Sequence, residues 1–362
     1  MSEARSGIDL AKIWGRRVFP LVSVLALVVI LVVVALLTGM QEANLLRALI
    51  DLLIVLALYL FSGISGIFSF GHIAFVAIGA YTAGILTIPI AKKDQLFEMP
   101  PLLESLSTGP IAAILAGALV AAVAAAIFGL AILRLSGIAA SIGTFSILVI
   151  VHVVAENLKS VTNGQSGMTA VPMTIGVWAL VLAAGVFIVI VFLYQSSPWG
   201  LRLRASREDD VAAQAVGIRV RGERWIAWVG SAALAGAAGA MYAQVVGTFA
   251  PGSFYLSQTF VIITMLVVGG SRSLAGAVTG VAVITVINEV LRRTSAGFTL
   301  GDLKLQSAPA LTPILLAIFM LVLLIVRPSG LTKGREFTIP HRREVAGKST
   351  RGRDVADANA GK

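Results

Sequence analysis

Long stretches without a charged side chain constrain this chain more than any other feature. Residues 52–91 and residues 225–271 are uncharged throughout, and residues 18–41 form a third such stretch. A helix needs about 20 consecutive apolar residues to cross the hydrocarbon core of a bilayer. Because the two longest stretches each have room for two crossings, the chain is predicted to pass through a membrane repeatedly.

Composition supports this prediction and excludes several other classes of protein. Charged residues make up only 13% of the chain, whereas soluble domains carry about 25%. Cysteine is absent, which excludes disulfides, thiolate metal sites and cysteine nucleophiles. The net charge of +10 arises from basic residues that flank apolar segments or fill the C-terminal tail. That distribution is typical of membrane topology and argues against binding to nucleic acid.

We therefore predict an all-α, polytopic transmembrane helical bundle with about ten spans. The predicted spans are residues 18–41, two within 52–91 that are separated by a turn near 62–66, 109–133, 135–155, 174–195, two within 225–271 that are separated by a turn at 250–253, 273–288 and 305–326. Basic residues beside the spans favour a cytoplasmic location for both termini.

The domain boundaries follow from these spans. Residues 1–17 form a cytoplasmic N-terminal segment, residues 18–330 the transmembrane domain, and residues 331–362 a basic, disordered cytoplasmic tail. Arg292 and Arg293 conflict with the charge rule, because ten spans place them outside. Either the short ninth span is a partial helix, or two arginines are too few to set the topology.

A polar segment at residues 196–224 interrupts the spans and carries six arginines, so it is predicted to be cytoplasmic. Ser206 and Asp209 have the approximate spacing of a capping box, which predicts a helix from about Ser206. Gly217 is expected to end that helix. The small alanines between them leave a surface that another protein can approach closely.

This polar segment resembles the coupling loop of ABC importer permeases, which fits into a cleft of the ATP-hydrolysing subunit. The matching positions are Gly200, Ala205, Arg207, Glu208, Ala212, Ala213 and Gly217. The importer signature begins with Glu-Ala-Ala, whereas Val211 occupies its first position here. The resemblance implies that the ATPase-coupling residues are Arg204, Arg207, Glu208, Asp210, Ala212, Ala213 and Gly217.

Three further segments are similar to the LivM-type permeases of the LivH/LivM family of branched-chain amino acid transporters. One matches at Ser69, Gly71, His72, Phe75, Gly79, Ala80 and Tyr81. Another is the glycine-rich run 268–276, in which Ala277 follows where the family often has proline. The third is the small-residue run 235–240, followed by Pro251. The resemblance covers residues 50–330.

His72 is the most interesting ionisable group, because neighbouring glycines permit a broken helix and such helices often line a transport path. A buried histidine with satisfied hydrogen bonds is the alternative. The candidate residues of the translocation path are Ser69, Gly71, His72, Phe75, Gly79 and Tyr81. His152 is expected at the membrane interface, and Glu289 is expected to pair with Arg292 or Arg293 rather than to relay protons.

Small residues that recur every four positions predict close helix packing. The predicted packing residues are Ala232, Gly236, Ala240, Gly276 and Gly280. A flexing transport helix is the alternative interpretation of these runs.

The chain contains no phosphate-binding loop, and its three histidines are scattered, so neither ATP hydrolysis nor a metal site is expected. The resemblance implies that this chain is a transporter subunit and no enzyme. It binds no cofactor itself, and ATP and Mg belong to partner subunits. The implied partners are two ABC ATPase subunits, a second LivH-type permease, an extracytoplasmic substrate-binding protein and membrane lipid.

The expected cargo is leucine, isoleucine or valine, carried across the cytoplasmic (inner) membrane. An importer for urea, amides or other amino acids remains open as an alternative. An ion-coupled secondary transporter would need central intramembrane carboxylates, whereas Asp51 and Glu289 are expected near span ends. An intramembrane hydrolase would need a paired base and nucleophile, and the sequence shows none.

Overall fold

The computed structural model describes residues 3–96, 100–132, 134–135, 137–295, 299–300, 303–304, 325, 327, 330–334 and 336. Apart from Ile325, the predicted tenth span at 305–326 lies outside these residues. The last part of the predicted tail, residues 337–362, also lies outside them.

Long helices dominate the described part of the chain. They are α1 (Glu3–Leu37), α2 (Glu42–Leu58), α3 (His72–Thr87), α6 (Pro110–Ile132), α7 (Gly137–Asn157), α9 (Val177–Ser196), α12 (Val220–Val246), α13 (Leu256–Gly269) and α14 (Leu274–Ser295). The shorter elements are a π-helical turn η1 (Tyr59–Gly63), α4 (Ile90–Leu96), α5 (Pro101–Glu104), α8 (Lys159–Thr162), η2 (Gly164–Ser166), α10 (Pro198–Glu208), α11 (Asp210–Ala215), η3 (Pro251–Phe254), and the paired strands β1 (Thr299–Leu300) and β2 (Leu303–Lys304).

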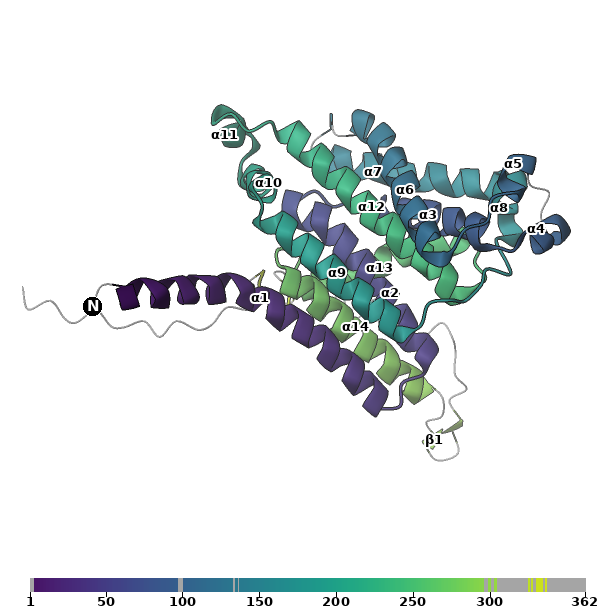
Figure 1. Cartoon of the computed structure of the whole chain (residues 1–362), viewed down its shortest axis with the longest axis horizontal. Coiled ribbons are helices and arrows are strands. Elements are labelled where there is room, and N and C mark those ends of the chain that lie inside the picture. Colours follow the sequence, from purple (N-terminus) through teal and green to yellow (C-terminus); the bar gives the residue numbers. More distant parts are fainter. Residues whose placement is uncertain are drawn as a thin grey trace, which may run out of the picture.

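The helices form one bundle with two distinct ends. Figure 1 shows α2, α9, α12 and α14 lying side by side, with α10 and α11 at one end. We call this the α10 end. The opposite end carries α4, α5 and η3, because these elements follow the far ends of α3 and α12.

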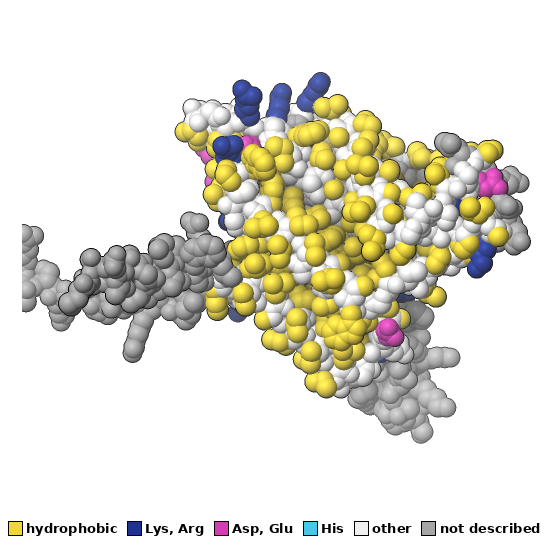
Figure 2. Space-filling model, in the orientation of Figure 1, with side chains coloured by type: hydrophobic (Ala, Val, Ile, Leu, Met, Phe, Trp, Pro, Cys, Tyr) yellow, Lys and Arg dark blue, Asp and Glu magenta, His cyan; other side chains and the backbone are white. Residues whose placement is uncertain are grey.

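Eight helices in the described residues are long and apolar enough to cross a membrane, and α3 is a shorter apolar helix of 16 residues. The outer faces of these helices carry exposed aliphatic side chains, such as Leu115 and Leu119 of α6. Figure 2 shows hydrophobic side chains over the broad middle of one face, with lysine and arginine at the edge near α11 and the start of α12. The predicted all-α, polytopic bundle is therefore confirmed.

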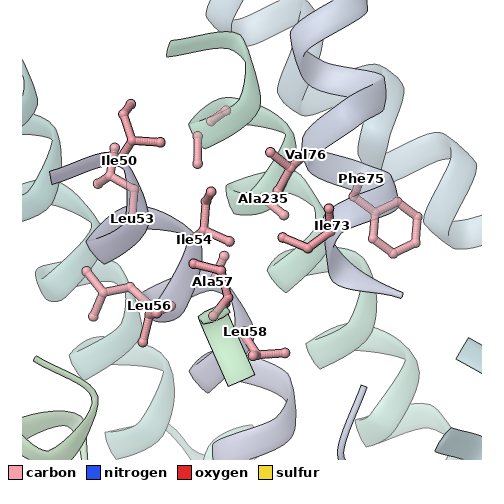
Figure 3. Packing of buried hydrophobic residues seen from close by; sticks show 14 of the residues in the cluster. Ile50, Leu53, Ile54, Leu56, Ala57, Leu58, Ile73, Phe75, Val76 and Ala235 are labelled. Atoms are coloured by element: carbon pink, nitrogen blue, oxygen red, sulfur yellow. The ribbon is translucent and has the colours of Figure 1, made fainter. Parts of the chain in front are cut away.

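α2 lies at the centre of the bundle, because residues 52–61 are all buried and apolar on every side. Figure 3 shows its residues Ile54 and Ala57 facing Ile73 and Val76 of α3. The helix begins at Glu42, ten residues before the predicted start of the uncharged stretch. Its first half therefore includes the charged residues Arg47 and Asp51.

The predicted turn between the second and third spans lies slightly later than expected. α2 continues through the π-helical turn η1 to Ser65, and irregular backbone follows before α3 begins at His72. The predicted turn between spans seven and eight is confirmed, since η3 occupies Pro251–Phe254.

The ninth span is longer than predicted. α14 runs for 22 residues from Leu274 to Ser295, so a partial helix is the wrong explanation for the position of Arg292 and Arg293. Both arginines belong to its last turn and pair with Glu289, which confirms the predicted ion pair.

Close backbone contacts join α3, α6 and α12. A Cβ atom added to Gly79 would meet the backbone of Gly236, and one added to Gly239 would meet the carbonyl of Val76. Gly236 in turn lies against Gly117 of α6. We call this contact the small-residue interface; it comprises Gly79, Gly117, Ala121, Gly236, Gly239 and Ala240. Such residues let helix backbones approach closely where lipid provides no hydrophobic drive.

A second close contact joins α13 and α14. Gly276 and Gly280 lie against the backbone of Gly269, Gly270 and Met265. The amide of Leu331 donates to the carbonyl of Val268 at 2.9 Å, and Glu336 accepts from the amides of Leu274 and Ala275 at 2.8 and 3.1 Å. Residues 331–334 and 336 therefore pack against this hairpin, although they fall within the segment that is predicted to be a disordered tail.

Candidate functional site

The polar segment at the α10 end consists of two short helices that meet at Asp209. The side chain of Asp209 accepts hydrogen bonds from the amides of Val211 and Ala212 at 2.9 and 3.0 Å, so it caps the start of α11. Ser206 lies inside α10 and donates to the carbonyl of Leu203. The predicted single helix from Ser206 is therefore wrong, because Asp209 caps a second helix while the Ser206 hydroxyl is bonded within α10. Gly217 follows α11 with a φ of +88°, in agreement with the predicted helix end.

Side chains of Arg207 and Asp210 connect this segment to the long helices. Arg207 of α10 donates to the carbonyl of Gly63, the last residue of the π-helical turn that extends α2. Arg224 of α12 contacts both carboxylate oxygens of Asp210 at 2.7 Å. Burial and the nearby charge of Arg272 lower the pKa of the Arg207 guanidinium from its ordinary value. A displacement of α10 or α11 therefore acts directly on α2 and α12.

The seven predicted coupling residues differ in exposure. Glu208, Ala212 and Gly217 are exposed, Arg204, Arg207 and Asp210 are half-buried, and Ala213 is buried. Two apolar side chains that sequence reasoning did not include, Val211 and Val216, are each 77% exposed. Val211 belongs to α11 and Val216 follows it, so the segment presents apolar side chains at the charged α10 end.

His72 lies in a closed aromatic cluster at the start of α3. Its Nδ1 lies 2.7 Å from Ser69 Oγ, and its Nε2 lies 2.9 Å from Ser231 Oγ. The imidazole is 2% exposed and is surrounded by the rings of Phe61, Phe75 and Trp228. Both ring nitrogens are thus satisfied, which favours the interpretation of His72 as a packed histidine.

The other candidate path residues do not join His72 in one site. Ser69, Gly71 and Phe75 gather around His72, with Gly71 packed against the backbone of Thr144. Gly79 belongs to the small-residue interface, and Tyr81 contacts the rings of Phe249 and Phe254. None of the six lines the polar cavity between α2, α12 and the α13–α14 hairpin.

A polar cavity of about 530 Å³ opens at the opposite end, between α2, α12, η3, α13 and α14. Its charged lining residues are Arg47 and Asp51 of α2 and Glu289 and Arg292 of α14. The neutral polar residues include Asn44, Tyr242, Ser253, Ser257, Gln258 and Asn288. We call it the outer cavity. Its volume lies within the range of about 300–1,000 Å³ that is usual for small-ligand sites.

The four charged residues of the outer cavity have different partners. Glu289 contacts Arg292 at 2.8 Å and Arg293 at 2.6 Å, and it accepts from Asn44. Asp51 accepts one hydrogen bond, from Gln258 at 2.8 Å. Among the described residues Arg47 donates no hydrogen bond and joins no ion pair. The Glu289 carboxylate is therefore shared by two arginines of α14, whereas Arg47 and Asp51 of α2 make few direct contacts.

Sequence reasoning missed this cavity because its lining comes from segments about 200 residues apart. One signal was present: ionisable residues within a span are functional candidates by default. Asp51 and Glu289 were expected near span ends, whereas α2 extends two turns before Asp51.

The remaining titratable residues of note do not form a metal site. No group of three histidine, cysteine, aspartate or glutamate residues suited to a metal occurs in the described part of the chain. His152 lies 3.4 Å from Glu156 and stacks on Tyr255 near the end of α7.

Comparison with known proteins places these features in a family. The family model described as the permease component of branched-chain amino acid transport systems matches residues 40–326. The high-affinity branched-chain amino acid transport system permease protein LivM of Escherichia coli is 25% identical over 278 residues, and that of Salmonella typhimurium is 24% identical. Each match covers 67% of this chain and 62% of the relative, so the match spans less than two thirds of those proteins. No solved structure matches the chain.

Proposed function

This chain belongs to the family of permease components of branched-chain amino acid transport systems, and we propose that it is the membrane subunit of an ATP-driven importer for leucine, isoleucine and valine. The observation that carries the proposal is the α10–α11 segment. It protrudes from one end of a multi-pass bundle, exposes Val211 and Val216, and connects to α2 and α12 through Arg207 and Asp210.

The α10 end faces the cytoplasm in this proposal. Arginines gather there, at positions 202, 204, 207, 219, 221 and 224, and basic residues near spans favour the cytoplasmic side. The opposite end, with the outer cavity, then faces the outside of the cytoplasmic (inner) membrane. Both termini are cytoplasmic when the tenth span at 305–326 is included.

Two ABC ATPase subunits bind ATP and Mg and dock on the α10–α11 segment. Closure of the ATPase pair on ATP moves this segment, and the Arg207–Gly63 and Arg224–Asp210 contacts transmit the movement to α2 and α12. The spans thereby alternate between outward-open and inward-open arrangements, which the ATPases favour by binding the two states with different affinity. The chain itself supplies no hydrolytic chemistry.

Two other partners complete the importer. A second permease of the LivH type forms the path together with this chain, and an extracytoplasmic binding protein delivers the amino acid to the outer end. Membrane lipid covers the exposed aliphatic faces of helices such as α6 and α9.

One observation favours a second candidate, an ion-coupled secondary transporter. Asp51 lies inside a span and lines a cavity, which is where such a transporter needs a carboxylate. Uptake that persists without ATP and follows a proton or sodium gradient would establish this candidate and contradict the importer.

The docking surface can be tested by co-purification with the ATPase subunits. Val211→Glu and Val216→Glu place an acid on the exposed face of the segment and are expected to abolish co-purification. Ser160→Glu adds the same charge at an exposed position of the opposite end and is expected to leave it intact. Equal recovery of the ATPase with all three variants would exclude this docking surface.

The cargo is tested by ATP-dependent uptake of radiolabelled leucine in competition with valine, isoleucine and urea. The proposal expects the three aliphatic amino acids to compete with one another and urea to have no effect. Competition by urea alone would indicate an importer of the same type that carries urea or amides.

A further inference from the structure

The outer cavity has features of a ligand site that the fold itself does not require. It is bordered by five elements and carries four charged lining residues, whereas α2 buries only aliphatic side chains along residues 52–58. Polar and charged groups inside a membrane bundle are costly, so they persist where they serve a function.

The charges of the lining balance. Arg47 and Arg292 oppose Asp51 and Glu289, so the cavity has no net formal charge. A ligand with a single charged group would therefore leave the lining groups of one sign without a partner. A net-neutral ligand that carries both a positive and a negative group meets a partner for each.

The two α2 charges are the groups that remain to bind such a ligand. Arg47 and Asp51 lie four residues apart, so they share one face of α2 about one turn from each other. Arg47 makes no ion pair within the described residues, and Asp51 accepts a single hydrogen bond, from Gln258. A guanidinium without a hydrogen bond among the described residues and a carboxyl with a single hydrogen bond thus line the same cavity.

The apolar part of the lining completes the complementarity. Met40, Ile50, Val245, Val246 and Met265 border the same cavity. Methionine adapts its shape to irregular apolar groups, which suits a site for aliphatic side chains of different branching.

From this arrangement we propose that the outer cavity binds a neutral α-amino acid with an aliphatic side chain, with its carboxylate on Arg47 and its ammonium group on Asp51. This inference rests on the proposed transport function and names the residues of this chain that receive the substrate. Gln258 is a positioning residue, since its amide orients the Asp51 carboxyl.

The absence of cysteine makes a direct binding assay possible. Ser257→Cys places a thiol on the exposed part of the cavity lining, and Ser160→Cys places one at the same end outside the cavity. The complete transport complex, in membranes without nucleotide, is treated with an impermeant maleimide, and labelling of this chain is followed with time.

Leucine is expected to slow the labelling of Ser257→Cys and to leave Ser160→Cys unchanged, whereas urea protects neither. Adding Arg47→Gln or Asp51→Asn is expected to raise the half-protecting leucine concentration about ten- to hundred-fold, as for loss of a hydrogen bond to a charged group. Lys92→Gln removes an exposed charge outside the cavity and should leave protection unchanged.

Two results would overturn the inference while the transport function stands. One is a complex that takes up leucine yet shows no protection of Ser257→Cys. The other is protection that is equally strong with Arg47→Gln and Asp51→Asn. A complex that takes up no leucine contradicts the proposed function instead. In that case, protection of Ser257→Cys by a neutral amino acid still supports the cavity assignment, and lack of such protection contradicts it.

Discussion

The small-residue interface and the outer cavity are built on the same helix in opposite ways. Along one face of α12, Gly236 and Gly239 contact the backbones of α6 and α3 with no space between them. At its far end, Tyr242, Val245 and Val246 border an open polar space. Close-packed backbones resist deformation, whereas a cavity between helices can change its volume. We therefore expect α3, α6 and α12 to behave as one rigid unit and the cavity beside it to be the part that changes shape.

The largest expected effect comes from adding a side chain to the rigid unit. Gly239→Leu forces a branched side chain onto the carbonyl of Val76, so we expect a loss of about 3 kcal/mol or more of stability, at the upper end for overpacking. Thermal unfolding of the detergent-purified protein measures this loss. Gly230→Leu is the control on the same helix, because a Cβ added to Gly230 meets nothing within 4 Å. Equal melting temperatures for both variants would contradict the rigid unit.

An intermediate effect is expected at the aromatic cluster. His72→Leu removes both imidazole hydrogen bonds and leaves the buried hydroxyls of Ser69 and Ser231 with fewer partners, at a cost of about 2 kcal/mol. The half-saturating leucine concentration for uptake should stay unchanged if His72 only packs. A shifted half-saturation at an unchanged melting temperature would return His72 to the translocation path.

The smallest effect on stability is expected in the outer cavity. Gln258→Ala removes the donor to Asp51, but water in the cavity can replace it, so the loss should stay below about 1 kcal/mol. Gln244→Ala is the matched substitution at a site without access to water, since Gln244 is fully buried and hydrogen-bonds to Thr174 and Pro110. Its loss of stability should be the larger of the two. The comparison fails if Gln258→Ala destabilises more, or if it leaves leucine uptake unaffected.

Much of the fold was predictable because apolar length and glycine spacing are local properties of the chain. The turn at residues 250–253 and the small-residue contacts of Gly236 lie where the pattern indicated. The start of α2 was not predictable from charge alone. Arg47 and Asp51 look like the end of a span in sequence, yet a polar cavity accommodates them inside the helix.

The site was less predictable than the fold, for two physical reasons. The break at Asp209 depends on competition between two capping side chains, and spacing alone favours neither. The outer cavity depends on tertiary contact between α2 and the α13–α14 hairpin, which no local pattern reports. His72 illustrates the opposite case: its motif was visible in the sequence, but its hydrogen bonds with Ser69 and Ser231 were not.

The π-helical turn at Tyr59–Gly63 has a consequence for the orientation of α2. A π turn widens the helix locally, as one inserted residue does, and one residue of an α-helix corresponds to about 100° of rotation. The turn therefore sets the rotation of α2 about its axis relative to the residues that follow the turn. Arg47 and Asp51 lie before the turn, and the carbonyl of Gly63 lies at its end. Removing one residue from this turn would rotate the first half by about that angle. Arg47 and Asp51 would then leave the cavity while α10 stayed attached to Gly63, which separates the orientation of these charges from the position of the α10–α11 segment.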